Sequence, residues 1–250
     1  MPAQPELDAF YRSGAFWDAT GNHPAQRAHE NVQAQLRVQH CIPHLQGDRP
    51  LRVLDIGAGH GCIADWLAKL LPGRIASYGF VELDTQRRAE ILEKQPGFAV
   101  HAFDGIPTEG QFDLILLNHV LEHVASPPQV ITAVTALIAE GGIAYVETPH
   151  LDYRFKSDVF PHTYFFSPGV YAQLAIGLPV RSLEGEAFGA WPGDKRGLAR
   201  QVHRGLSLAF AVAVKLRWQG LQRALDRAIW RYRANPQGIW VRWLITPLRR

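Results

Sequence analysis

The sequence predicts a doubly wound α/β domain, with a mostly parallel sheet that carries helices on both faces. Short apolar runs alternate with segments of helical spacing between residues 51 and 147, and a glycine-rich turn directly follows the first run. A chain of 250 residues that is 47% hydrophobic is long enough for one large domain with a substantial core. Ligands bind such sheets beyond the carboxyl ends of the strands, so residues placed there are candidates for a site.

Five apolar or β-branched runs predict strands in chain order, over residues 51–56, 75–83, 98–103, 112–117 and 143–147. Apolar side chains at helical spacing predict helices over 24–40, 63–71, 85–94 and 131–139. The pair Gly141-Gly142 is interpreted as the end of the last helix. Helical crossovers between successive strands favour parallel pairing.

Charge divides the chain near Asp194 into two unlike parts. Residues 1–194 contain 13 Lys and Arg against 22 Asp and Glu, whereas residues 195–250 contain 13 against one, Asp226. Four of the seven Trp also lie in the second part. We therefore predict an N-terminal helical segment over 1–45, a core over 46–194 and a basic helical tail over 195–250.

The tail contains a predicted amphipathic helix that ends at Asn235-Pro236. One face holds Trp218, Leu221, Leu225, Ala228, Ile229 and Tyr232, and another holds Arg223, Arg227 and Arg231. Four roles fit: association with an anionic membrane surface, docking onto the acidic first part, binding of RNA phosphates, or a specificity insertion before a seventh strand over 239–245. Membrane association and self-docking are favoured over nucleic acid.

Cysteine usage and hydropathy favour a cytoplasmic protein. Cys41 and Cys62 are too few for a disulfide framework, and neither lies in a zinc-type cluster. The N-terminus lacks the apolar stretch of a signal peptide, and the longest apolar run, 206–214, is about half the roughly 20 residues that a membrane span needs. Peripheral attachment at the inner face of the membrane, through the tail, stays open.

A glycine turn and two acids mark a predicted nucleoside site. Gly57 and Gly59 let the backbone approach a ligand closely. Glu82 ends the second strand, where a carboxylate can accept both ribose hydroxyls, and Asp104 ends the third, within reach of an adenine amino group. Cys62 stands where a dinucleotide fingerprint has glycine, which favours a mononucleoside. The alternative is a turn that only permits close packing of strand and helix.

Several segments together resemble one family. VLDIGAGHG, GFVELD, FDG, FDLILLNHVLEHVASP and IAEGGIAYVETP are similar, in order and spacing, to the motifs of class I S-adenosylmethionine-dependent methyltransferases of the small-molecule, glycan and ubiquinone-type branch. PHTYFFSP, residues 161–168, resembles the element that follows the fifth strand there. The resemblance covers about residues 50–188 and implies a Rossmann-like, seven-stranded fold with S-adenosyl-L-methionine as cofactor.

The resemblance also implies roles for nine residues. Asp55, Gly57, Ala58 and Gly59 would bound the methionine part of the cofactor, Glu82 would bind the ribose, Leu83 would flank the adenine, Asp104 and Gly105 would hold its edge, and Asn118 would lie near the sulfonium. A positive sulfonium and a diol both favour a site rimmed with carboxylates and carbonyls. Asp55 has the alternative role of capping the glycine turn, and Asp84 is better explained as a helix N-cap.

Residues 118–123, NHVLEH, match the metalloprotease pattern H-x-x-E-H. That pattern requires a helix, so that both histidines face one zinc ion, but here a strand precedes it directly. We interpret it as a loop beside the transferable methyl group. Some ubiquinone-type O-methyltransferases carry a metal-binding E-x-x-E-H in this loop, and His119 replaces the first Glu. We predict no metal, with a divalent cation at Glu122, His123 and His119 as the alternative, because Mg²⁺ prefers the lost oxygen ligand.

Methyl transfer to a hydroxyl needs a base with a pKa near neutral, which favours histidine. His123 and His162 are the first candidates for the catalytic base, and His119 and His150 are the second choice. Residues 1–45 resemble the lid of such enzymes. Its aromatic side chains would either cover the cofactor or pack the helix onto the sheet; they are Phe10, Tyr11, Phe16 and Trp17.

The sequence thus predicts O-methylation of a small-molecule, glycan or lipid-linked acceptor. Two alternatives stay open: a non-catalytic partner that only binds the cofactor, and an RNA-directed methyltransferase that grips phosphates with its basic tail. No N-P-P-Y type element follows the fourth strand, which argues against methylation of base amines.

Overall fold

The computed structural model describes residues 3–15, 23–150, 162, 164–174, 176–178, 180–190 and 197–248. Phe16 and Trp17 of the predicted lid lie outside these residues, as do Pro161 and Thr163 of the PHTYFFSP segment.

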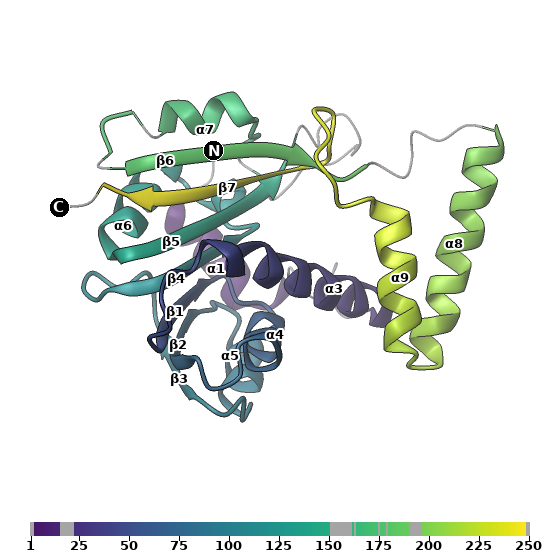
Figure 1. The fold of residues 1–250 in the computed structure, drawn as a ribbon, viewed down its shortest axis with the longest axis horizontal. Coiled ribbons are helices and arrows are strands. Elements are labelled where there is room, and N and C mark those ends of the chain that lie inside the picture. The colour runs from purple at the N-terminus through teal and green to yellow at the C-terminus, as the bar shows by residue number, and fades with distance from the viewer. Residues whose placement is uncertain are drawn as a thin grey trace.

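Seven strands form one sheet in the order β3-β2-β1-β4-β5-β7-β6 (Figure 1). They are β1 (Leu51–Ile56), β2 (Ile75–Val81), β3 (Ala99–Phe103), β4 (Phe112–Asn118), β5 (Ile138–Pro149), β6 (Val180–Phe188) and β7 (Trp240–Pro247). The first five pair in parallel, and β7 runs antiparallel to both β5 and β6. The predicted fold class is confirmed. The strand order reverses between β1 and β4, which opens a crevice at their carboxyl ends.

Helices cover both faces of the sheet, as predicted. α3 (Pro24–Cys41), α4 (Cys62–Leu70) and α5 (Thr85–Leu92) build the core on one face, and α6 (Pro127–Leu137) and α7 (Pro168–Leu174) build the core on the other. Successive strand residues alternate between the two cores, because neighbouring side chains of a strand point to opposite faces. Val53 therefore packs in the first core and Leu54 in the second.

The predicted boundary between the helix over 131–139 and the strand over 143–147 is wrong. Residues 138–142 belong to β5, whose register shifts between the pairs Phe112 with Ile138 and Leu114 with Ile143. Gly141 has φ +72°, and a Cβ on Gly142 would lie 2.9 Å from the Phe112 carbonyl oxygen. The glycine pair therefore permits an irregularity inside one strand, where the sequence suggested a stop.

The N-terminal segment begins with α1 (Gln4–Arg12), which lies at the carboxyl-end crevice. The Gln4 side-chain oxygen accepts a hydrogen bond of 2.9 Å from the Ala125 amide, in the loop after β4. α3 carries Pro24 at its first position, where the missing N–H costs no helical hydrogen bond.

The basic tail forms two helices between β6 and β7, α8 (Gly197–Lys215) and α9 (Gln219–Trp230). Figure 1 shows them side by side beyond the end of α3, away from the sheet. Three members of the predicted apolar face are exposed, Trp218, Leu221 and Ala228. Asp226 is buried, and its carboxylate accepts hydrogen bonds from His29 and Tyr232. None of the helices within the described residues is long and apolar enough to cross a bilayer.

Candidate functional site

A cavity of about 890 Å³ opens at the carboxyl ends of β1, β2 and β4. It is lined by all nine residues that the sequence assigned to the cofactor: Asp55, Gly57, Ala58, Gly59, Glu82, Leu83, Asp104, Gly105 and Asn118. The candidate bases His123 and His162 line it as well. α1 and α3 contribute the wall that faces the strand ends, as Tyr11 and Glu30 illustrate.

The glycine turn after β1 brings backbone to the cavity. Gly57, Gly59 and Gly61 have φ of +75°, +55° and +65°, a conformation that favours residues without a Cβ. A Cβ on Gly57 would lie 2.6 Å from Val120 Cγ2. The turn is fastened to the second strand, since the Gly57 amide donates to the Val81 carbonyl at 2.8 Å.

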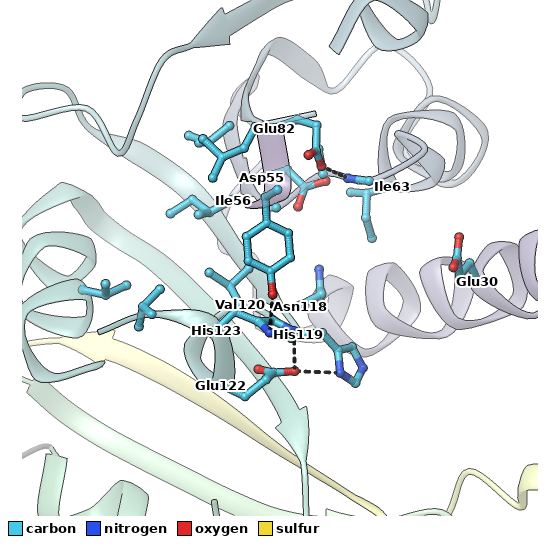
Figure 2. A pocket seen from close by; sticks show the side chains of 18 of the residues that line it. Glu30, Asp55, Ile56, Ile63, Glu82, Asn118, His119, Val120, Glu122 and His123 are labelled. Carbon is cyan, nitrogen blue, oxygen red and sulfur yellow. Dashed lines mark hydrogen bonds and ion pairs between the residues drawn. The ribbon is translucent and has the colours of Figure 1, made fainter. Parts of the chain in front are cut away.

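The carboxylate of Glu82 is held by two backbone amides. Gly59 N–H donates to one oxygen at 2.7 Å, the contact drawn at Glu82 in Figure 2. Asp84 N–H donates to the other oxygen at 2.9 Å. Burial raises the pKa of Glu82 to about 7, and these amides partly oppose the rise. Each carboxylate oxygen keeps a further lone pair for a donor in the cavity.

Asp55 and Asn118 each present a buried oxygen without a partner among the described residues, Oδ1 in both cases. The other oxygen of Asp55 accepts from the Tyr78 hydroxyl at 2.6 Å. Burial raises the pKa of Asp55 to about 6, although this hydrogen bond lowers it. Unsatisfied buried acceptors are costly, so both atoms call for a donor or a positive charge from a ligand.

The third strand end is more open. The side chain of Asp104 is 95% exposed and pairs with Arg88 at 2.9 Å, while Arg88 also donates to the Phe103 carbonyl. Leu83 and Gly105 also line the cavity. Asp84 accepts the Arg87 amide at 2.8 Å and caps α5, in agreement with the predicted N-cap role.

The NHVLEH segment leaves β4 and turns at once. His119 has φ +56°, and Leu121–His123 form a short 3-10 helix, η2. A turn of three residues cannot present two histidines from one face of an α-helix, which removes the metalloprotease interpretation. The segment is a loop at the cavity, as predicted.

His119 bridges two carboxylates, one from its own loop and one from β5. Nδ1 lies 3.2 Å from Glu122 Oε1, and Nε2 lies 3.3 Å from Glu147 Oε1 (Figure 2 shows the first contact). Burial opposes a charge on the ring, but the hydrogen bonds to Glu122 and Glu147 raise the pKa of His119 to about 9. An imidazolium that donates from both nitrogens has no lone pair left for a proton or a metal ion.

Glu147 and Arg37 form a buried ion pair behind His119, which the sequence did not indicate. Arg37 donates to Glu147 Oε1 at 2.5 Å and the Tyr145 hydroxyl donates to Oε2 at 2.5 Å. Burial raises the pKa of Glu147, but the Arg37 charge and the His119 hydrogen bond hold it well below its usual range. Glu147 could have been suspected from its place at the end of β5, whereas Arg37 lies in a polar helix without any motif.

The lid and the loop meet at Tyr11 and His123. The Tyr11 hydroxyl lies 2.7 Å from His123 Nδ1, and His123 Nε2 lies 3.7 Å from Glu122 Oε1. Burial raises the pKa of Tyr11 and the Glu122 charge adds to this, so the phenol stays protonated. Although burial would raise the pKa of Glu122, the His119 hydrogen bond and the nearby histidines lower it.

His162 stands next to this pair, with its ring centroid 4.9 Å from that of His123. Glu122, His123 and His162 offer ligand atoms that all lie within 4.8 Å of one another. A divalent cation would find its ligands in this group and not at His119, which both carboxylates occupy. The absence of a metal, and a divalent cation as its alternative, both remain predictions.

His150 lies apart from the cavity lining. Its Nδ1 is 2.9 Å from the Phe166 carbonyl oxygen, and its amide donates to the Ile239 carbonyl at 2.8 Å. These contacts give it a structural role in joining β5 to its neighbours.

A further wall of the cavity comes from the tail, in agreement with the alternative of an insertion before a seventh strand. Trp230 at the end of α9 and Trp240 at the start of β7 line it beside His29 of α3. The His29 ring centroid lies 4.8 Å from that of Trp230 and 6.2 Å from that of Trp240. Aromatic walls of this kind suit a flat or apolar acceptor.

Comparison with known sequences identifies methyltransferases. The family described as "Methyltransferase domain" matches residues 27–209. The ubiquinone biosynthesis O-methyltransferase of Xanthomonas euvesicatoria pv. vesicatoria (strain 85-10) is 31% identical over 150 residues, which cover 58% of this chain and 61% of that protein. The enzyme of the same name from Xanthomonas axonopodis pv. citri (strain 306) is 30% identical over the same shares. The chain thus matches only about 61% of the length of these curated relatives.

Solved structures share the fold. Phosphoethanolamine N-methyltransferase 2 of Haemonchus contortus, in complex with S-adenosyl-L-methionine, has a TM-score of 0.61 at 18% identity and covers 96% of this chain and 60% of its own. A possible histamine N-methyltransferase from Thermotoga maritima has a TM-score of 0.55 at 14% identity and covers 97% and 98%.

Proposed function

The chain belongs to the methyltransferase-domain family of class I S-adenosylmethionine-dependent enzymes, and we propose that it transfers the methyl group of S-adenosyl-L-methionine to a hydroxyl of a small-molecule acceptor. One observation carries the proposal. The cofactor residues expected from the sequence line a single cavity with a hydrogen-bonded Tyr11–His123 pair, so a base is available beside the cofactor site.

The residues present fit the cofactor. The unpartnered Oδ1 atoms of Asp55 and Asn118 can accept from a ligand ammonium or face a sulfonium, and Glu82 can accept from a ribose diol. Gly57 is required beside them, because any Cβ there would lie 2.6 Å from Val120 Cγ2 and would displace the loop that follows Asn118. When bound, S-adenosyl-L-methionine supplies an electrophilic methyl carbon.

The lid and loop residues supply the proton path. In our proposal the acceptor hydroxyl gives its proton to Tyr11 Oη while the Tyr11 proton moves to His123 Nδ1. The imidazolium that forms has its Nε2–H facing the ionised Glu122, which stabilises the charge. His162 is the second candidate base, because it lines the cavity beside His123.

The acceptor is proposed to be a hydroxylated aromatic compound. The relatives named as ubiquinone biosynthesis O-methyltransferases support oxygen as the acceptor atom. The aromatic wall of His29, Trp230 and Trp240 supports a flat ring. The basic tail favours a lipid-linked acceptor as the alternative. A glycan acceptor has the least support from this aromatic wall.

Methyl transfer from labelled S-adenosyl-L-methionine to a panel of catechols, simple phenols, aliphatic alcohols and sugars tests the proposal. We expect label in the phenol group, with formation of a methyl ether. Calorimetry with S-adenosylhomocysteine, run in parallel, separates the alternatives. Cofactor binding without transfer to any acceptor would favour a non-catalytic partner, and transfer to RNA only would favour the RNA-directed alternative.

A further inference from the structure

α8 carries an apolar face that no other described element covers. Its large exposed side chains are Leu198, Val202, Leu208 and Val212, and exposed Leu216 follows directly after its last residue; their exposed fractions are 48% to 75%. At 100° per residue these positions fall within roughly a third of the helix circumference. Two further exposed apolar side chains follow, Trp218 at the N-cap of α9 and Leu221 in the first turn of α9. We call these seven residues the apolar stripe.

Every exposed charged side chain of the α8–α9 hairpin is basic. Exposed cationic residues of the two helices and their ends are Arg200, Arg204, Lys215, Arg217, Arg227, Arg231 and Arg233. Residues 197–233 contain one acid, Asp226, whose side chain is fully buried. It accepts hydrogen bonds from His29 and Tyr232, both at 2.7 Å, and so contributes no exposed negative charge.

The opposite side of the hairpin is anchored to the rest of the protein. Phe210, Ala213 and Ile229 are buried, and the Gln222 side chain donates to the Ala213 carbonyl at 3.0 Å. Asp226 ties α9 to α3 through His29. The apolar stripe therefore cannot turn inward, and Figure 1 shows α8 at the outer edge of the molecule.

We propose that the α8–α9 hairpin docks on an anionic lipid surface, with the apolar stripe at the level of the acyl chains and the basic side chains at the headgroups. An interfacial helix combines a broad apolar face with a Lys- and Arg-rich border in this way. A second copy of this chain fits less well, because equivalent basic borders would face each other across a two-fold contact. Nucleic acid would use the cations but not five aliphatic side chains.

Sedimentation of the full chain with vesicles tests the proposal. The probes are phosphatidylcholine vesicles with and without about one third phosphatidylglycerol, at low salt. We expect binding to the anionic vesicles and little to the neutral ones. Arg200→Gln/Arg204→Gln/Lys215→Gln should weaken binding roughly a hundredfold, since each cation near such a surface contributes about a factor of five.

The double variant Val202→Glu/Leu216→Glu should abolish binding to anionic vesicles, and Leu92→Glu, which changes an exposed apolar residue on α5, should leave it unchanged. Circular dichroism and melting temperatures check that the variants are folded. Failure of the wild type to sediment at low salt, or equal binding by Val202→Glu/Leu216→Glu, overturns the proposal. A concentration-dependent dimer in light scattering that this double variant dissolves would assign the stripe to a second copy and overturn it too.

Discussion

The hydroxyl of Tyr11 and Nδ1 of His123 lie 2.7 Å apart, although 112 residues separate them in the chain. The contact joins the N-terminal helix to the loop after β4, so the lid takes part in the proposed chemistry. A lid that only covered the cofactor would not need a hydroxyl at this point.

Tyr11→Phe should lower kcat by one to two orders of magnitude and leave the affinity for S-adenosylhomocysteine within about twofold. The ring keeps its packing, but the proton path to His123 is broken. Steady-state kinetics on the accepted phenol and calorimetry measure the two quantities. An unchanged kcat would show that Tyr11 is only a structural contact.

His123→Ala should lower kcat about a hundredfold or more, again with little change in cofactor affinity, because base catalysis typically contributes 10²- to 10⁴-fold. His162→Ala should have the same pattern if His162 holds the acceptor or its proton. His101→Ala, at an exposed position of β3, is the matched control and should be neutral. Equal loss of turnover and cofactor affinity in His123→Ala would argue against its role as base.

Cofactor affinity should rise with pH through about 7. Burial raises the pKa of Glu82 to about 7, and ribose hydroxyls donate to its ionised form, so binding lowers that pKa and releases a proton. Below pH 7 the dissociation constant of S-adenosylhomocysteine should therefore increase, by up to tenfold per pH unit. Below about pH 6, protonation of Asp55 should steepen the loss.

Calorimetry between pH 5.5 and 8 checks this dependence, and Glu82→Gln provides the comparison. The amide cannot titrate, so the slope between pH 6 and 7 should flatten while overall affinity falls. The same slope in wild type and Glu82→Gln would assign the titration to another group.

Arg37→Met should destabilise the fold by about 3–5 kcal/mol, because it leaves the buried carboxylate of Glu147 with only His119 to balance its charge. The double variant Arg37→Met/Glu147→Gln should recover part of that loss, since no unpaired charge remains. Urea unfolding of Arg37→Met, Glu147→Gln and the double variant gives the coupling free energy between the two side chains. If the losses in the free energy of unfolding of the two single variants add up in the double variant, the pairing is contradicted.

The sequence by itself determined the sheet and the half of the cavity that is proposed to hold the cofactor. Strand and helix periods are local, and the ends of consecutive parallel strands must meet at one edge, so Asp55, Glu82 and Asn118 could be placed together before any coordinates. The prediction of a helix end at Gly141-Gly142 was wrong, because a glycine pair permits either a helix end or an irregular strand. Local sequence does not choose between these.

Tertiary structure alone decided the other half of the cavity. Tyr11 with His123, Arg37 with Glu147, and His29 with Asp226 are pairs more than 100 residues apart, and no motif spacing encodes them. It also decided which side of the tail is exposed. Helical periodicity shows that α8 and α9 have apolar faces, but which face is buried depends on what packs against it. Asp226 is buried with two hydrogen-bond partners, whereas the apolar stripe stays exposed because no other described element packs against it.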